Sequence, residues 1–301
     1  MVFEIIFLQI LAMSTVYMLS LLGEIIAEKS GVVNLSLEGS IALGASTAYA
    51  ISVTSGSTLL ALLGGGLAGV IPSLALAIAS VYLAMNMIAS GLAISSIFSA
   101  VSIVIGDSVP RVSQDRLVVS SEIFTIILLF VISLLLVSIA EFIVRGKIGL
   151  KIRSAGEDPY SAYSLGINIW RIRSLTLIIA GFLGGISGAL MILTPIISII
   201  WREGITSGVG FIIVAMTPLT LWSTPLAIPV SIFLGSISQV TVYLQTSGLI
   251  KISTEMSNAI PYIVALSLYT IFRVVLTKRR VRLGLVPRAL GREILLEERY
   301  E

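Results

Sequence analysis

The sequence predicts an all-α integral membrane protein, a polytopic bundle of about eight to ten transmembrane helices with one short cytoplasmic helix. Hydrophobic residues make up 56% of the 301 residues and charged residues only 12%, and the mean hydropathy is +1.07. Soluble domains carry about 25% charged residues. The apolar stretches approach the roughly 20 residues that cross a hydrocarbon core, and they do not alternate as the strands of a membrane barrel would.

Nine segments are predicted spans. The first lacks a basic leader and runs straight into more membrane sequence, so it is predicted as a span and not as a cleaved signal. The third contains Gly64, Gly65, Gly66 and Pro72, and the seventh is short, so either could be broken or re-entrant. The segments are residues 4–22, 35–53, 59–83, 86–105, 123–144, 175–197, 208–221, 225–244 and 259–277.

Basic residues gather in the central loop and at the C-terminal end, which predicts that both regions are cytoplasmic. Four predicted spans separate the two regions, and an even number of crossings returns the chain to the same side of the membrane. The count of spans therefore agrees with a cytoplasmic location for both regions. We therefore expect a multi-pass cell-membrane protein with a permeation domain at 1–277, a cytoplasmic loop at 145–173 and a basic cytoplasmic tail at 278–301. The tail is predicted to contain a partly amphipathic helix that contacts anionic lipid. The side on which the N-terminus lies stays open.

The polar block "GEIIAEKSGVVNLSLEGS" lies between the first two spans. Gly31 permits a backbone excursion, Asn34 can cap a helix that starts near Leu35, and Glu38 follows one turn later. The block is predicted to be a broken helix junction. Two interpretations remain open: an interfacial loop whose acidic groups lie in headgroup water, or a junction whose Asn34 and Glu38 shape the transport pathway.

Two further polar pairs have the spacing of one helix face. Asn86 and Ser90 could bind a solute or a neighbouring helix. Gln239 could form hydrogen bonds with the edge of a base or sugar ring of the solute, and Tyr243 could stack on the face of that ring. Tyr243 could equally lie in an interfacial aromatic belt. The glycines of residues 181–188 predict a closely packed helix face.

The central loop contains a predicted helix of two turns, at about 159–165. Asp158 suits an N-cap, Pro159 the first helical turn and Gly166 a left-handed stop. Tyr160 and Tyr163 would be its aromatic contacts. Because so short a helix is marginal alone, it is predicted to dock on another surface, with a headgroup-level connector as the alternative.

Several kinds of chemistry are excluded. Cysteine and histidine are absent, so there is no thiol site, and no nucleophile and base constellation is visible. No G-x-x-x-x-G-K-[ST] phosphate loop occurs. We expect no catalytic residue and no metal ligand in this chain, and no nucleic-acid partner.

The blocks "EKSGVVNLSLEGSIALGA", "LAMNMIASGLA", "GLKIRSAGEDPYSAYSLGINIWRIRSLTLIIAGFLGGISGAL" and "EMSNAIPYIVALSLYTIF" resemble permease subunits of ABC-type importers. The branch is the one for branched-chain amino acids, simple sugars and nucleosides, nearest to its nucleoside and simple-sugar members. The resemblance covers about residues 24–271. The stretch "GFIIVAMTPLTLWSTP" departs from it, because relatives usually have a glycine-containing turn there.

The resemblance implies a permease that borrows its ATPase, so that ATP and magnesium bind to a partner chain. It also implies a second permease subunit, identical or different, and an extracytoplasmic solute-binding protein. The helix at 158–166 would be the coupling helix that docks on the ATPase, with Tyr160 and Tyr163 on it. Its rim contacts would be Arg153, Glu157, Arg171 and Arg173.

For the solute, the resemblance favours a nucleoside, then a simple sugar, then a branched-chain amino acid. A secondary transporter coupled to an ion gradient is the alternative from another class. It would place ionisable residues in the middle of the membrane, and Glu38 is the one candidate among the predicted spans.

Overall fold

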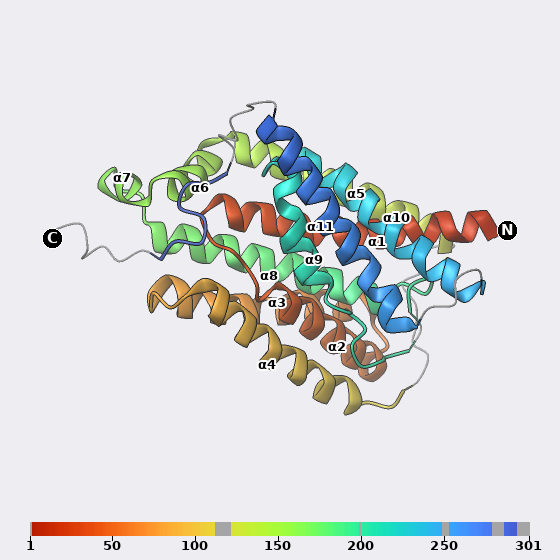
Figure 1. Cartoon of the computed structure of the whole chain (residues 1–301). Helices are drawn as coiled ribbons and strands as arrows, with labels where there is room; N and C mark the ends of the chain where they lie inside the picture. Colours follow the sequence, from red (N-terminus) through yellow and green to blue (C-terminus); the bar gives the residue numbers. More distant parts are fainter. Residues whose placement is uncertain (1, 112–121, 199, 249–252, 279–285, 294–301) are drawn as a thin grey trace.

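The computed structural model describes residues 2–111, 122–198, 200–248, 253–278 and 286–293. Every regular element in these ranges is a helix, which confirms the predicted all-α class. The helices form one elongated bundle, with the N-terminal end of α1 at one end and α6 and α7 at the other (Figure 1).

A helix corresponds to each of the nine predicted spans. Six stretches of the described chain are long and apolar enough to cross a membrane, those of α1, α3, α4, α5, α8 and α10. The helices are α1 Val2–Lys29, α2 Leu37–Ser55, α3 Thr58–Leu76, α4 Met87–Asp107, α5 Glu122–Arg145, α8 Ile169–Leu193, α9 Val209–Met216, α10 Ala227–Thr246 and α11 Thr254–Lys278.

Three expectations about these spans are resolved. The first span does not end at residue 22, because α1 continues for two more turns to Lys29. The third is not broken: α3 runs through Pro72 and continues directly into a π-helix, Ala77–Tyr82. The seventh is broken, since α9 has only eight residues before it tightens into a 3₁₀ turn, Thr217–Thr220.

Helices α2, α3 and α8 pack together through glycines. A methyl group on Gly181, Gly185 or Gly188 would overlap the main chain of α3 or α2, so only glycine permits this approach. The predicted small-residue face of α8 is therefore confirmed. It makes these three helices the most closely packed part of the bundle.

Between α1 and α2, residues 30–36 form a non-helical segment that we call the re-entrant connection. At its start Gly31 lies against Arg173, near the beginning of α8, and at its end Leu37 lies against Gly184. These two α8 residues are 11 positions apart, or roughly 16 Å along the helix axis. The chain therefore turns back into the bundle, and α2 begins about halfway along α8 (Figure 1).

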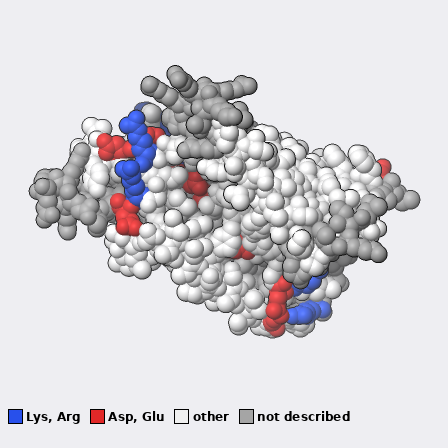
Figure 2. All heavy atoms as spheres, viewed as in Figure 1, with Lys and Arg blue, Asp and Glu red and all other residues white. Residues whose placement is uncertain are grey.

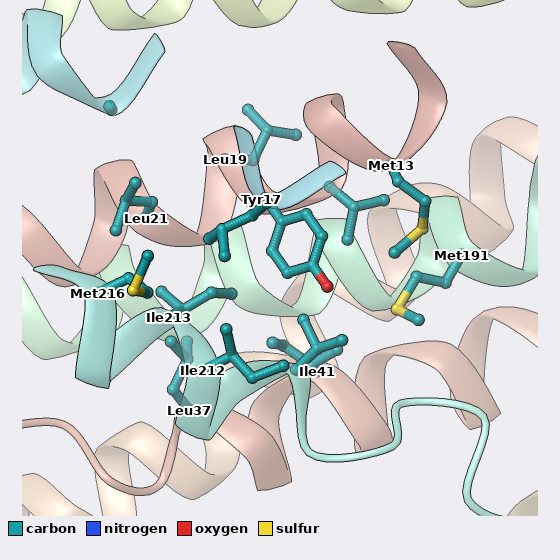
Figure 3. Packing of buried hydrophobic residues seen from close by; sticks show 14 of the residues in the cluster. Met13, Tyr17, Leu19, Leu21, Leu37, Ile41, Met191, Ile212, Ile213 and Met216 are labelled. Carbon is teal, nitrogen blue, oxygen red and sulfur yellow. The ribbon is translucent and has the colours of Figure 1, made fainter. Parts of the chain in front are cut away.

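The largest buried cluster joins α1, α2, α8, α9 and α10 around Tyr17 (Figure 3). Outside it, α4 and α5 expose large apolar side chains such as Leu92, Val104 and Phe142. On the face drawn in Figure 2, charged side chains gather at the two ends of the bundle and leave a broad, nearly uncharged band between them. This is the surface expected of a protein with a lipid-facing belt.

Candidate functional site

A cavity of about 500 Å³ opens in the half of the bundle that lies away from α6 and α7. It lies between α1, α10, α11 and the segment that leads from α8 into α9. Its volume is within the range of small-molecule sites. Its lining includes Met13, Tyr17, Met191, Ser198, Arg202, Glu203, Thr206, Ser207, Ser238, Gln239, Gln245, Thr246 and Pro261.

The lining of this cavity combines apolar side chains with hydroxyl and amide groups. The Tyr17 hydroxyl lies 2.9 Å from the Ser238 hydroxyl, and the two share a hydrogen bond. Figure 3 shows the Tyr17 ring at the centre of the cluster, with its hydroxyl directed towards the side of Met13 and Met191. The charged lining residues, Arg202 and Glu203, are exposed. Such a lining can hold a neutral polar solute through hydrogen bonds and apolar contact.

Glu38 holds one wall of the cavity in place. Its carboxylate is 5% exposed and accepts three hydrogen bonds, from the Thr206 hydroxyl at 2.5 Å and from the main-chain N–H groups of Gly208 at 3.0 Å and Gly210 at 2.7 Å. Thr206 and Gly208 lie in the segment that enters α9, and Gly210 lies in the first turn of α9 itself. Glu38 therefore acts here as the anchor of that segment.

The geometry around Glu38 comes from two helix starts that meet inside the bundle. Glu38 lies in the first turn of α2, and the N–H groups at the start of α9 point at its carboxylate. The first N–H groups of a helix lack partners within it and carry a partial positive charge, so a carboxylate stabilises them. Glu38 therefore stabilises both helix starts at once.

The anchored segment, residues 204–208, separates two cavities. It lines the larger cavity on one side and a smaller one, of about 160 Å³, on the other, where Glu38 and Trp201 also contribute. Ser207 has a φ of +46°, a left-handed conformation that costs energy outside glycine. The Tyr262 hydroxyl of α11 donates to the Gly208 carbonyl at 2.6 Å. Residues of this segment therefore line both cavities.

At the opposite end, α6 (Lys147–Glu157) leads into α7 (Pro159–Ser164). The Asp158 carboxylate accepts from the Ser161 N–H at 3.0 Å, and Gly166 ends the helix with a φ of +83°. The predicted cap and stop are confirmed. Tyr163 stacks edge-on against Trp170, and Leu165 is 81% exposed.

Around this short helix, the side chains of Arg153, Glu157 and Arg171 are exposed, and Tyr160 is partly exposed. Arg173 is not a rim residue, contrary to the prediction, because it is 1% exposed. It turns inward and donates to the Ser30 carbonyl at 3.1 Å and to the Arg292 carbonyl at 3.0 Å. Burial of a charge beneath the chain's own tail is not visible in a pattern of basic residues.

Asn34 does not cap a helix near Leu35, contrary to the prediction. Helix α2 begins later, at Leu37, and the Asn34 side chain accepts from the Ser36 hydroxyl at 2.6 Å. Its main-chain N–H donates to Glu24 at 3.0 Å. The reason is the inward course of the connection, which uses Asn34 to hold a turn against α1.

The other predicted pathway residues lie in different places. Asn86 is the N-cap of α4 and accepts from the N–H groups of Ile88 and Ala89, while the Ser90 hydroxyl donates to the Asn86 carbonyl. Gln239 lines the larger cavity. Tyr243 lies one turn further along α10 and is not among the residues that line it.

Sequence reasoning placed Glu24 and Glu28 in the polar block between the first two spans but did not predict that both would be buried on a helix. Both lie in the part of α1 beyond residue 22, and Glu28 accepts from the Trp222 indole N–H at 2.5 Å. Their spacing of four residues, continuing the period of α1, was the available signal. In the part of the chain that the structure describes, no group of three acidic side chains could hold a metal ion.

Comparison with known proteins gives a consistent picture. The model of a family described as "Branched-chain amino acid transport system / permease component" matches residues 6–268. Similar proteins include the guanosine ABC transporter permease protein NupQ of Bacillus subtilis, 27% identical over 72% of this chain and 75% of the relative. The nucleoside ABC transporter permease protein NupC of Lactococcus lactis is 26% identical over 89% and 92%.

A third similar protein is the putative glucose ABC transporter permease protein TsgC13 of Haloferax volcanii, 26% identical over 69% of this chain and 68% of the relative. No solved structure matches the chain. The matches span most of both partners, so the similarity concerns the whole bundle and not one motif.

Proposed function

This chain belongs to the branched-chain amino acid transport system permease family, and we propose that it is the permease subunit of an ATP-driven importer for a nucleoside or a simple sugar. The observation that supports the solute class is the cavity of about 500 Å³, whose lining offers hydroxyl and amide groups such as Tyr17, Ser238 and Gln239, while its two charged residues are exposed.

The energy for transport comes from a separate ATPase, which binds ATP and magnesium. Helix α7 is the coupling helix, because its exposed Tyr163 and Leu165 offer an apolar contact between basic and acidic side chains. Of these, Arg153, Glu157 and Arg171 form the rim of the contact and set its register, while each contributes little energy. The basic α6–α7 end and the C-terminal tail face the cytoplasm.

In this orientation the larger cavity faces outwards, towards a solute-binding protein that delivers the solute. ATP binding closes the ATPases, and α7 moves with them. The cavity then closes towards the outside and opens towards the cytoplasm. Within the chain, Glu38 and the segment that it anchors form the wall that has to move. Asn34, Asn86, Ser90 and Tyr243 act by holding helix starts and helix contacts around this pathway. A second permease subunit completes the pathway.

The test is transport by the native complex. The tagged chain is purified in mild detergent, proteins and small molecules in the eluate are identified, and the complex is reconstituted in vesicles. We expect an ATPase to co-purify and ATP-dependent uptake of labelled guanosine or glucose, with leucine as the comparison solute. The double variant Pro159→Leu with Gly166→Val should insert normally and lose uptake. Uptake that needs only a proton or sodium gradient would overturn the proposal in favour of a secondary transporter.

A further inference from the structure

The described part of the C-terminal tail, residues 286–293, packs against three other segments of the chain. Ala289 is 4% exposed. Its N–H donates to the Gly156 carbonyl at the end of α6, at 2.8 Å, and the Gly291 N–H donates to the Gly31 carbonyl of the re-entrant connection, at 3.0 Å. We call α6 and α7, residues 147–164, the coupling end of the bundle. The tail thus forms main-chain hydrogen bonds with both the coupling end and the re-entrant connection.

A third contact joins the same tail to α8. Arg173 donates from one nitrogen to the Ser30 carbonyl and from another to the Arg292 carbonyl. A buried guanidinium needs acceptors for its donors, and one of its two is supplied by the tail. Two side-chain contacts flank these bonds: Arg288 lies 3.8 Å from Glu157, and Asn86 donates to Glu293 at 3.3 Å.

The contacts of the tail lie between α7 and the connection that leads to Glu38. Gly156 precedes α7 by three residues and packs so closely against α1 that a methyl group there would overlap the Lys29 carbonyl. Gly31 begins the connection that leads to Glu38, the anchor of the cavity wall. The tail therefore lies at the point where the coupling end and the connection meet.

We propose that residues 287–293 are an intramolecular brace, which makes the coupling end, the re-entrant connection and α8 move together. This proposal rests on the proposed function, because it assigns to the brace the transfer of ATPase movement towards Glu38. The positioning residues are Ala289, Gly291 and Arg173. The brace holds throughout the transport cycle and does not act as a latch that opens.

The first experiment compares Ala289→Arg with Arg292→Ala in the reconstituted complex. A bulky charged side chain cannot occupy the buried site of Ala289, whereas the Arg292 side chain is exposed and its carbonyl is retained in the control. We expect Ala289→Arg to assemble with the ATPase and keep basal ATP hydrolysis. Solute uptake per ATP should fall about tenfold, within the usual range for coupling between distant sites. Uptake per ATP equal to that of the control would overturn the brace.

The second experiment needs no disruptive substitution. The chain has no cysteine, so Ala289→Cys introduces a single thiol whose reaction with a maleimide reports exposure. We expect protection both at rest and during ATP hydrolysis. Rapid labelling during hydrolysis would identify a latch instead, as would faster hydrolysis and uptake in Ala289→Arg. A parent complex without solute-stimulated ATP hydrolysis would contradict the proposed function, while thiol protection would still test the contact itself.

Discussion

Two buried charges hold the two ends of the re-entrant connection, and they differ in how completely they are paired. Glu38, at the inner end, accepts three hydrogen bonds from one segment. Arg173, at the outer end, donates to two carbonyls from two different segments, and its second terminal nitrogen has no partner among the described residues. A fully paired buried group resists rearrangement more than a partly paired one. We therefore expect the removal of Glu38 to destabilise the protein more than the removal of Arg173.

The largest effect should come from removing the better paired charge. Glu38→Ala leaves two N–H groups and a hydroxyl buried without an acceptor, and should lower the free energy of unfolding by about 3 to 5 kcal/mol. Thermal unfolding in detergent measures this, and vesicle uptake should be lost. Glu38→Gln keeps one oxygen acceptor and should lie between Ala and the parent. Wild-type uptake by Glu38→Ala would mean that the segment holds its position without the anchor.

The partly paired charge should be less costly to remove. Arg173→Gln deletes the charge and shortens the side chain, so one of the two carbonyls loses its donor, at an expected cost of about 1.5 to 3 kcal/mol. Arg173→Lys keeps the charge but not the forked geometry, and should recover part of the loss. The measurement is again thermal unfolding, alongside uptake per ATP. If Arg173→Gln were more damaging than Glu38→Ala, the ranking of the two ends would be reversed.

Removal of one of the three hydrogen bonds that Glu38 accepts should have a smaller effect than removal of either buried charge. Thr206→Val preserves the shape of the side chain and removes only its hydroxyl donor, which should cost about 1 to 2 kcal/mol. Because segment 204–208 separates the two cavities, we expect weaker apparent solute affinity with little change in assembly. Transport kinetics at several solute concentrations measure this, and Ser207→Ala, on the same segment but without a bond to Glu38, is the matched control. If Thr206→Val and Ser207→Ala changed the apparent solute affinity equally, the hydrogen bond from Thr206 to Glu38 would have no specific role in holding the segment.

An exposed charge should have the smallest effect. Arg111 lies 3.0 Å from Asp107 and 3.7 Å from Glu203 beside the same segment. The hydrogen bond to Asp107 raises the pKa of Arg111 above its ordinary value. Exposed ion pairs contribute little, and Arg111→Ala should change uptake by less than about twofold. A larger loss would point to a docking role for this surface, which pull-down of the solute-binding protein would measure.

Features with local causes were predictable from the sequence. Asp158 and Gly166 set the ends of α7 through bonds within a few residues, and the glycines of α8 show a packing face in their spacing alone. The break in the seventh span was foreseen from its length. These predictions depend on residues that are neighbours in the sequence or on one helix.

Features that depend on distant contacts were not predictable. Hydropathy ended the first span at residue 22, because Glu24 and Glu28 lower it, but their carboxylates accept from residues 10 and 194 positions away. Arg173 resembles the exposed basic residues around it, but it bonds to Ser30, 143 positions away, and to the tail residue Arg292, 119 positions away. Glu38 could be named as a candidate, whereas its partners at 206–210 lie 168 or more positions away.

The half-length α9 also bears on how the protein is made. Eight residues span roughly 12 Å, less than half of a hydrocarbon core, so α9 cannot enter the bilayer as an independent span. The N–H group of Gly210, at the start of α9, donates to Glu38 of α2, so this bond requires Glu38 to be in place. Biogenesis therefore has an order, in which the long helices insert first and the wall of the cavity assembles against them afterwards. A folding defect in the early helices would appear as an unformed transport site in a protein that still reaches the membrane.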